Sequence, residues 1–480
     1  SQSTAPRAGE ELRGELEGKA ASWVARQASA DGRLDVAGMA WAFGVLELAA
    51  PAIRLLEARG AGTVFVNGVA VAGDVYGYGT PPVPVALEAG RNELFATGLR
   101  GLELRLCAPR RAVDLVALDA TLPDLVRGER LVGAIGIVLV CAQEQPSGPL
   151  RVQAEARGLT IPPLELAEGL PPLGLCKVTL RVEGALVDDG VQALELSVAL
   201  QTGAGQELAR EVFPLTIRPT GSLRQATYAS AVDGAALDYA LLPPSGEPRA
   251  KTPGLVLSLH GAGVSAFGQA ACYSPKAEFW IAAPSNRRPY GFDWQDWGRR
   301  DAYEVLDLAL GKSAADRDQV CVTGHSMGGH GSWHLAVNDP DCFAACAPSA
   351  GWESFDTYGG RPSGARAKLW KSADASSATA DLIGNLRSLP VYILHGTADD
   401  NVPVREALHM AELLTGVGVT VSAHFQGGAG HWWGNACVDW APMFELFARV
   451  RRNTDAESLD WTSVDPGIDA EHAWLRGEQL

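Results

Sequence analysis

The stretch Val320-Cys-Val-Thr-Gly-His-Ser-Met-Gly-Gly329 decides the fold, because it combines a strand, a turn and a helix start. Its first four residues are apolar or β-branched, which predicts a buried strand. The next five fit the pattern G-x-S-x-G, and Gly331–Val337 is predicted to continue as a helix. On such a turn the serine hydroxyl is exposed, and the flanking glycines are needed where the chain turns back on itself. The stretch therefore predicts a nucleophilic Ser326 at a helix N-terminus.

Strands and helices alternate on both sides of this stretch. Gly254–Leu259 is a continuous apolar run, as expected of a parallel strand buried on both faces. Further strands are predicted at Glu278–Ala283, Gln319–Thr323, Phe343–Ala347, Val391–Leu394 and Val419–Phe425, and helices at Asp301–Leu310 and Val404–Thr415. This alternation predicts an α/β fold with a doubly wound, mostly parallel sheet and helices on both faces.

A serine nucleophile needs a base, and the base needs an orienting carboxylate. Two acids, Asp399 and Asp400, follow the predicted strand Val391–Leu394, and His431 follows the next strand. Because α/β sheets place their sites at the carboxyl ends of strands, we expect one aspartate and His431 to meet Ser326 there. The segment Leu259-His-Gly-Ala-Gly263 ends the first strong strand and offers a backbone N–H for an oxyanion hole.

Residues 224–452 resemble the α/β-hydrolase superfamily, and specifically its branch of prolyl oligopeptidase-type hydrolases and their esterase relatives. The resemblance rests on three motifs, Gly324-His-Ser-Met-Gly-Gly329, His395-Gly-Thr-Ala-Asp-Asp-Asn-Val402 and Gly428-Ala-Gly-His431. It implies that Ser326 is the nucleophile, that His431 is the general base, and that Asp399 rather than Asp400 is the acid. It also implies an oxyanion hole made by the backbone N–H groups of Met327 and Ala262.

The chain departs from the peptidases of that branch in two respects. It has no propeller repeats before the hydrolase region, and Met327 stands where those peptidases often have an aromatic residue. We therefore expect a serine esterase that cleaves carboxylic esters through an acyl-enzyme, on small, polymeric or carbohydrate-linked substrates, without a metal or organic cofactor. The alternatives are a prolyl oligopeptidase-type serine peptidase and a sugar-binding protein with an inactive hydrolase domain.

Five tryptophans fall in loops that we expect at the catalytic end of the sheet. One hypothesis is that they line an acyl or sugar cleft with their broad apolar faces, and the other is that several seal the contact with the β domains. They are Trp294, Trp297, Trp352, Trp432 and Trp433.

Two β-rich regions precede the hydrolase region, which we place at residues 223–455. Residues 1–110 contain the hairpin signal Val66-Asn67-Gly68 and a strand, tight turn and strand over Val85–Leu94, and they resemble the jelly-roll modules of carbohydrate-active enzymes. Residues 111–222 alternate polar and apolar residues, as in Cys176–Val182, and predict an immunoglobulin-like sandwich. We expect both regions to act as spacers and walls, and residues 456–480 to be a tail with a strand at Leu459–Val464.

Composition narrows the choice of partners. Forty Lys and Arg against 56 Asp and Glu give a net charge of −16, which disfavours nucleic acid. The longest apolar run, Leu131–Ala142, is too short to span a bilayer. The polar start at Ser1 has no signal-peptide pattern, so such a signal is either absent or already removed. The eight cysteines form no CxxC ladder, which disfavours zinc and leaves disulfides, compartment and oligomeric state open.

Four further side chains carry simple expectations. His330 and His334 have the i, i+4 spacing of metal ligands, but no third ligand is evident, so we expect packed or surface histidines. Arg287 and the tail residue His472 are expected to be solvated.

Overall fold

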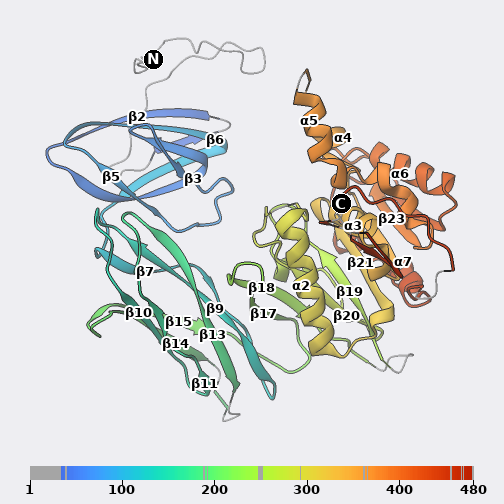
Figure 1. The fold of residues 1–480 in the computed structure, drawn as a ribbon, viewed down its shortest axis with the longest axis horizontal. Coiled ribbons are helices and arrows are strands. Elements are labelled where there is room, and N and C mark those ends of the chain that lie inside the picture. The colour runs from blue at the N-terminus through green and yellow to red at the C-terminus, as the bar shows by residue number, and fades with distance from the viewer. Residues whose placement is uncertain are drawn as a thin grey trace. The chain divides into compact units, whose positions relative to one another are not determined.

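The computed structural model describes residues 34–477, except residues 38, 39, 187–189, 192, 247–251, 292, 361, 362, 365, 454–456, 466 and 469. The first part of the expected jelly-roll-like region, residues 1–33, lies outside the described residues. The chain folds into two compact units, drawn in Figure 1. The first comprises the described residues up to Thr121 with 134–184 and 191–215, and the second comprises 122–133, 185–190 and the residues from 216 onward.

An eight-stranded sheet forms the centre of the second unit. Two antiparallel pairings at one edge, β17 with β18 and β18 with β20, are followed by parallel pairings through the rest of the sheet. The spatial order is β17 (Arg224–Ala229), β18 (Ala236–Leu242), β20 (Phe279–Pro284), β19 (Gly254–Leu259), β21 (Val320–His325), β22 (Ala345–Ser349), β23 (Val391–Gly396) and β24 (Val421–Gln426).

Apolar cores cover both faces of this sheet. Leu255 and Leu257 of β19 point into one core, together with residues of α2 (Asp296–Ser313), α3 (Met327–Asn338) and α6 (Arg405–Gly416). Val256, between them in sequence, points into the opposite core with α7 (Ala441–Phe447). Successive residues of a strand face opposite sides, so an uninterrupted apolar run is what a sheet covered twice requires. The expected doubly wound α/β arrangement is confirmed.

Short elements complete the second unit. They are β8 (Leu125–Val126) paired with β16 (Ile217–Arg218), the helices α1 (Ala266–Ala270), α4 (Phe355–Tyr358) and α5 (Arg366–Ala373), and the hairpin of β25 (Glu471–His472) and β26 (Leu475–Arg476). No helix of the described part is both long and apolar enough to cross a membrane.

The tail differs from the expectation at Leu459–Val464, which is not a strand. The backbone of Thr462 pairs with the side-chain amide of Asn385 and not with a neighbouring strand. The Thr462 N–H donates to Oδ1 of Asn385 at 2.8 Å, and Nδ2 of Asn385 donates to the Thr462 carbonyl oxygen at 2.9 Å. His472 is also not solvated, because its side chain is buried and lies 3.0 Å from a carboxylate oxygen of Asp341.

The first unit is built from strands. One sheet contains β1 (Leu34–Ala37), β2 (Ala40–Leu48), β3 (Ala52–Val66), β4 (Val69–Ala72), β5 (Val83–Leu87) and β6 (Gly90–Cys107). Asn67 and Gly68 have positive φ values of 49° and 81° and join β3 to β4 in the expected two-residue hairpin. β5 and β6 do follow one another closely, but β5 pairs with β3 and not with β6.

Two four-stranded sheets make up most of the rest of the first unit, although residues 130–133 and Ala185, at the ends of two of their strands, belong to the second unit. One has the order β12 (Leu164–Leu166), β10 (Leu150–Glu155), β14 (Leu194–Thr202) and β15 (Glu207–Leu215). The other has the order β11 (Leu159–Thr160), β13 (Leu175–Ala185), β9 (Arg130–Cys141) and β7 (Val113–Thr121). The β-rich character expected of this region is therefore present, while its jelly-roll-like and immunoglobulin-like classes, and the boundaries between them, stay predictions.

One buried carboxyl links α2 to the sheet edge. Asp301 has no exposed surface, and it accepts hydrogen bonds from the Tyr228 hydroxyl on β17 and from the Asn286 N–H, the latter at 2.7 Å. Burial raises the pKa of Asp301 to about 7, because the hydrogen bonds only partly offset the loss of water around the charged form.

Replacing Asp301 with Asn is expected to remove a pH dependence of stability. The folded pKa lies above that of an unfolded aspartate, about 3.9, so the folded state holds this proton between roughly pH 4 and 7. The unfolding free energy of the wild type should therefore fall relative to D301N as the pH rises through that window. Urea unfolding at several pH values measures the difference. The exposed Asp307→Asn change on the same helix is the control, and a constant difference between wild type and D301N contradicts the account.

Candidate active site

Ser326 lies between β21 and α3, in a backbone conformation that few residues other than glycine adopt. Its φ is 59° and its ψ is −119°, and its N–H donates to the Ser349 carbonyl oxygen at 2.9 Å. A strained conformation of this kind persists only where the surrounding structure enforces it. The turn expected from the G-x-S-x-G pattern is thus present, and α3 begins directly after the serine, earlier than predicted.

Both glycines of the pattern are needed because backbone atoms pass very close to them. A Cβ atom on Gly328 would lie 1.9 Å from the Leu259 carbonyl oxygen. A Cβ atom on Gly324 would lie 2.4 Å from the Gly328 carbonyl oxygen. Any side chain at either position would therefore push α3 away from β19 and displace Ser326.

Three side chains from separate loops meet at this turn. The Ser326 hydroxyl oxygen lies 2.9 Å from Nε2 of His431, and Nδ1 of the same ring lies 2.8 Å from Oδ2 of Asp399. These loops follow the carboxyl ends of β21, β24 and β23, which are neighbours or near neighbours in the sheet. The structure thus brings together the hydroxyl of Ser326, the imidazole of His431 and the carboxylate of Asp399, in that order.

Asp399 is held as a carboxylate by several donors. Burial alone would raise its pKa. The hydrogen bonds from His395, from His431 and from two backbone N–H groups have a larger effect in the opposite direction, so the pKa lies well below the ordinary value. The backbone donors are Asn401 and Val402, each 2.9 Å from Oδ1. Asp400, the other acid of the motif, is exposed. The geometry therefore favours Asp399, as the resemblance implied.

A second histidine, His325, packs beside the base. Its ring centroid lies 4.8 Å from that of His431, and its Nδ1 lies 3.2 Å from the Ser349 hydroxyl. Burial, and to a smaller extent the neighbouring His431, lower the pKa of His325 to about 3. His325 therefore stays neutral and adds no positive charge next to the base.

Two backbone N–H groups close to Ser326 have no carbonyl partner among the described residues. Met327 is the first residue of α3, so its N–H has no carbonyl acceptor one helical turn earlier. Ala262 follows Gly261, whose Cβ position lies 3.4 Å from the Ser326 Cβ, and the Ala262 N–H has no hydrogen-bond partner within the described ranges. The helix N-terminus adds positive potential at the same point.

Three of the five tryptophans are packed rather than open to solvent. Trp294 has no exposed surface, its Nε1 donates to the His260 carbonyl oxygen at 3.1 Å, and its ring fills the space above Gly331. Trp352 is 4% exposed and stacks on His330. Trp433 is half-buried against the core that includes α7. The cleft hypothesis is therefore wrong for Trp294, which belongs to the core.

The other two tryptophans are accessible. Trp432 is 47% exposed, and its ring meets the edge of His325 at a centroid distance of 5.0 Å. Trp297 is 41% exposed and lies 4.8 Å from the guanidinium carbon of Arg287. Arg287 itself is not solvated as expected, because its side chain is 8% exposed and paired with Asp233.

Replacing Trp432 with Ala is expected to raise KM for aryl esters by about two- to tenfold, the value of one aromatic contact, with little change in kcat. Initial-rate kinetics over a series of esters measures this effect. Trp370→Ala, which removes a similarly exposed tryptophan on α5, is the control and should leave KM unchanged. An unchanged KM for every accepted ester would remove Trp432 from the substrate contacts.

Sequence reasoning missed several groups around the triad. Tyr358 stacks on Trp352 at 4.4 Å, and its hydroxyl donates to Asn401, two residues after Asp399. Asp293 is half-buried, and burial raises its pKa to about 7. Its Oδ2 has no hydrogen-bond partner among the described residues. No periodic pattern marks these residues, since Tyr358 ends the four-residue helix α4, Asp293 lies in a turn, and they meet only in the folded chain.

Metal-binding geometry is not found in the described part of the chain, where no group of three His, Cys, Asp or Glu side chains gathers. His330 and His334 are both buried, and His330 contacts the Trp352 carbonyl oxygen and the Gln295 amide at 3.1 Å each. Each of the eight cysteines is a free thiol.

Comparison with known proteins places the triad within a family match. Residues 287–447 match the prolyl oligopeptidase family, which confirms the resemblance to prolyl oligopeptidase-type serine hydrolases for this part of the chain. An uncharacterized secreted protein of Arthroderma benhamiae is 28% identical over 249 residues. That alignment covers 45% of this chain and 26% of the relative, so the chain spans about a quarter of the relative's length.

Solved structures of a hydrolase and a peptidase are similar to this chain at lower identity. An S-formylglutathione hydrolase from Agrobacterium tumefaciens is 16% identical with a TM-score of 0.38, covering 48% of this chain and 95% of that chain. An acylaminoacyl peptidase of Pyrococcus horikoshii is 14% identical with a TM-score of 0.39, covering 71% of this chain and 57% of that chain.

Proposed function

We propose that this chain, a serine hydrolase of the prolyl oligopeptidase type over residues 287–447, cleaves carboxylic esters through an acyl-enzyme on Ser326. The observation that carries the proposal is the continuous contact from the Ser326 hydroxyl through His431 to Asp399, with heavy-atom distances of 2.9 and 2.8 Å. Both distances are those of hydrogen bonds through which a proton can move.

In the first half of the reaction, Ser326 attacks the ester carbonyl carbon while Nε2 of His431 takes the hydroxyl proton. The carboxylate of Asp399 accepts the Nδ1–H hydrogen bond, holds the ring in that tautomer and stabilises the imidazolium. The N–H groups of Met327 and Ala262 bind the oxyanion of the tetrahedral intermediate. His431 then donates its proton to the departing alcohol, and the acyl group stays on Ser326.

In the second half, water replaces the alcohol. His431 takes a proton from the water, whose oxygen attacks the acyl carbon, and the second tetrahedral intermediate uses the same two N–H groups. When it breaks down, the proton returns to Ser326 and the carboxylic acid leaves. The complete cycle uses only side chains and backbone groups of this chain and one water molecule.

A peptidase activity is the second candidate, and one observation favours it. Asp293 is half-buried, and one of its carboxyl oxygens is buried without a hydrogen-bond partner among the described residues. Burial raises the pKa of the nearby Tyr358, and the charges of Asp293 and of Asp399 raise it further. Such a carboxyl could accept hydrogen bonds from the N–H or amino group of a peptide. Met327 in place of an aromatic residue remains the reason to rank esters first.

A substrate panel separates the two candidates. Purified protein is assayed on short-chain aryl esters, on acetylated and feruloylated sugars, and on peptide anilides, with Ser326→Ala as the blank for each. The proposal predicts ester turnover that exceeds anilide turnover by far and disappears in the blank. Rapid anilide cleavage with negligible ester turnover would replace the esterase by the peptidase. A folded protein that turns over neither would favour the sugar-binding alternative.

The β-rich first unit suggests how the substrate could be presented. We infer that its sheets form a jelly-roll-like region and an immunoglobulin-like sandwich that act as spacers, and that the esters are linked to carbohydrates or polymers. The name of the fungal relative supports a secreted location, which signal-peptide mapping of the natural gene product would test.

A further inference from the structure

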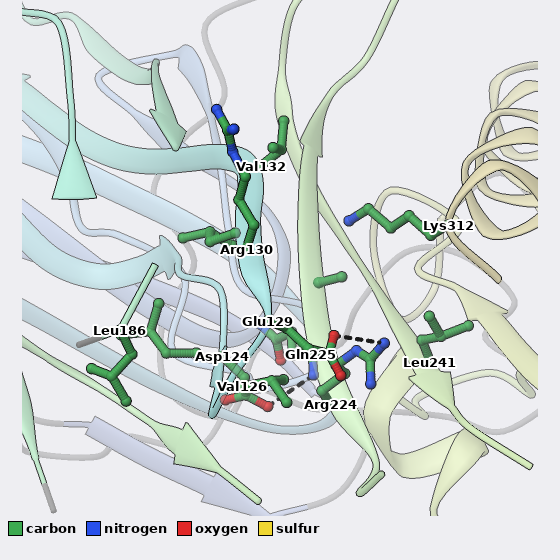
Figure 2. A pocket seen from close by; sticks show the side chains of 13 residues that line it. Asp124, Val126, Glu129, Arg130, Val132, Leu186, Arg224, Gln225, Leu241 and Lys312 are labelled. Carbon is green, nitrogen blue, oxygen red and sulfur yellow. Dashed lines mark hydrogen bonds and ion pairs between the residues drawn. The ribbon is translucent and has the colours of Figure 1, made fainter. Parts of the chain in front are cut away.

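A cavity of about 470 Å³ lies within the second unit (Figure 2), and none of the triad residues lines it. The triad residues follow the carboxyl ends of their strands, whereas Lys312 of the cavity lies in the last turn of α2, which leads back to the amino end of β21. The cavity is therefore at the opposite edge of the parallel sheet, and the catalytic proposal leaves it without a role.

One side of the cavity is formed by a segment that hydrogen bonds hold along the sheet edge. Residues 122–132 lie along β17, where Asp124 accepts hydrogen bonds from the Gln225 N–H at 2.8 Å and from Nε of Arg218 at 2.9 Å. β8 in the same segment pairs with β16. Seven apolar side chains line the cavity: those of Leu125, Val126, Ala226 and Leu241 are buried, those of Leu131 and Leu186 are half-buried, and that of Val132 is exposed.

The acidic groups of the cavity are already engaged. Asp124 is paired with Arg218, which comes from outside the lining. Glu129 lies 3.2 Å from Nη2 of Arg224, and the Arg224 side chain is only 12% exposed. Nη1 of the same guanidinium is buried and has no hydrogen-bond partner among the described residues. One donor of this buried cation is therefore left unused.

A second cation faces the same space. Figure 2 shows the ammonium group of Lys312 pointing into the cavity from α2. Its Nζ lies 5.5 Å from the Tyr239 ring, and the described residues place no carboxylate within ion-pair distance of it. Desolvation lowers the pKa of Lys312, and the nearby Arg224 lowers it further, while Glu129 acts in the opposite direction. Glu129 thus pairs with Arg224, and Lys312 has no ion-pair partner among the described residues.

We propose that this cavity binds a small organic anion. Its carboxylate or phosphate group would contact Lys312 and Arg224, and its apolar part would lie against Leu125, Val126 and Leu241. The anion would supply the hydrogen-bond acceptors that Lys312 and Nη1 of Arg224 lack. The cavity volume falls within the range of small-molecule sites. The site does not depend on the hydrolase activity, so it can be tested even if that activity fails.

The test is isothermal titration of the full chain at constant ionic strength with octanoate, phenyl phosphate and inorganic phosphate, and with octanol as the uncharged probe. The account predicts saturable binding of at least one organic anion and weaker binding of octanol and of inorganic phosphate. The first two probes decide whether the head group is a carboxylate or a phosphate.

Two variants assign the binding to this cavity. Lys312→Met keeps the length of the side chain and should weaken anion binding roughly tenfold or more, the weight of one charge-assisted hydrogen bond. Val132→Trp should block the space without removing a charge, since Val132 lines the cavity and is exposed. Lys371→Met, which removes an exposed lysine of α5, should leave the affinity unchanged.

Circular dichroism and thermal unfolding confirm that each variant is folded. No saturable binding of any organic anion to the wild type would overturn the proposal. Equal affinity of wild type and Lys312→Met, with both folded, would also overturn it, because the anion would then bind elsewhere.

Discussion

Replacing Ser326 with Ala is expected to lower kcat on a reporter ester by roughly 10⁴- to 10⁶-fold. The hydroxyl is the only group of the triad that forms the bond to the acyl carbon, so no neighbouring side chain can replace it. KM should change little, because the hydroxyl contributes little to ground-state binding. Single-turnover and steady-state kinetics of the purified variant measure the loss.

Ser332→Ala is the matched control for this variant. Ser332 lies on the same helix, and its buried hydroxyl donates to the Gly328 carbonyl oxygen at 2.8 Å rather than to His431. The control should retain kcat within about threefold and lose about 1 kcal/mol of stability. A Ser326→Ala protein with wild-type turnover would show that the nucleophile is another residue.

Replacing Asp399 with Asn is expected to lower kcat by roughly 10³- to 10⁴-fold. An amide can occupy the same space and still accept from the Asn401 and Val402 N–H groups, but it no longer stabilises the imidazolium of His431. It also allows the wrong tautomer of the ring, in which Nε2 carries the proton and cannot act as a base. The effect should therefore fall on kcat and leave the fold intact.

The adjacent Asp400→Asn change is a stringent control, because it removes the same charge one residue away. Asp400 is exposed, and no hydrogen bond connects it to His431 among the described residues. Its replacement should alter kcat by less than about twofold, as expected of a solvated surface charge. Equal losses from the two substitutions would contradict the assignment of the acid.

The sequence predicted six of the eight strands of the sheet, but not β17 and β18. It also predicted that Ser326, His431 and one aspartate meet, and the family resemblance selected Asp399 as that aspartate. The reason is that strand ends fix positions: Ser326 and Asp399 follow apolar strands that the pattern located to within two residues, and His431 follows a third. Once parallel strands share a sheet, residues at their carboxyl ends are neighbours regardless of their separation in the chain.

The burial of individual tryptophans could not be predicted from the sequence. Trp294 and Trp297 are three residues apart, one just before α2 and the other in its first turn, yet Trp294 is fully buried and Trp297 is 41% exposed. Trp294 is buried because Gly331 on α3 leaves room for its ring and because the His260 carbonyl accepts its N–H. Both partners come from other parts of the chain, so no local pattern could distinguish the two residues.

The tail and the cavity were missed for a related reason. Leu459–Val464 alternates like a strand, but the side chain of Asn385 satisfies the backbone of Thr462 in place of a partner strand. Lys312 and Arg224 lie in different elements, and each reads as an ordinary surface cation in the sequence. Their shared cavity exists only after residues 122–132 pack along β17.

Mass spectrometry of the trapped intermediate tests the central claim most directly. The protein is incubated with an aryl phosphonate that mimics the tetrahedral intermediate, quenched in acid and digested. The account predicts one adduct per chain, on the peptide that contains Ser326, and no adduct in Ser326→Ala. A stoichiometric adduct on any other residue, or a folded wild-type protein that stays unlabelled, would contradict it.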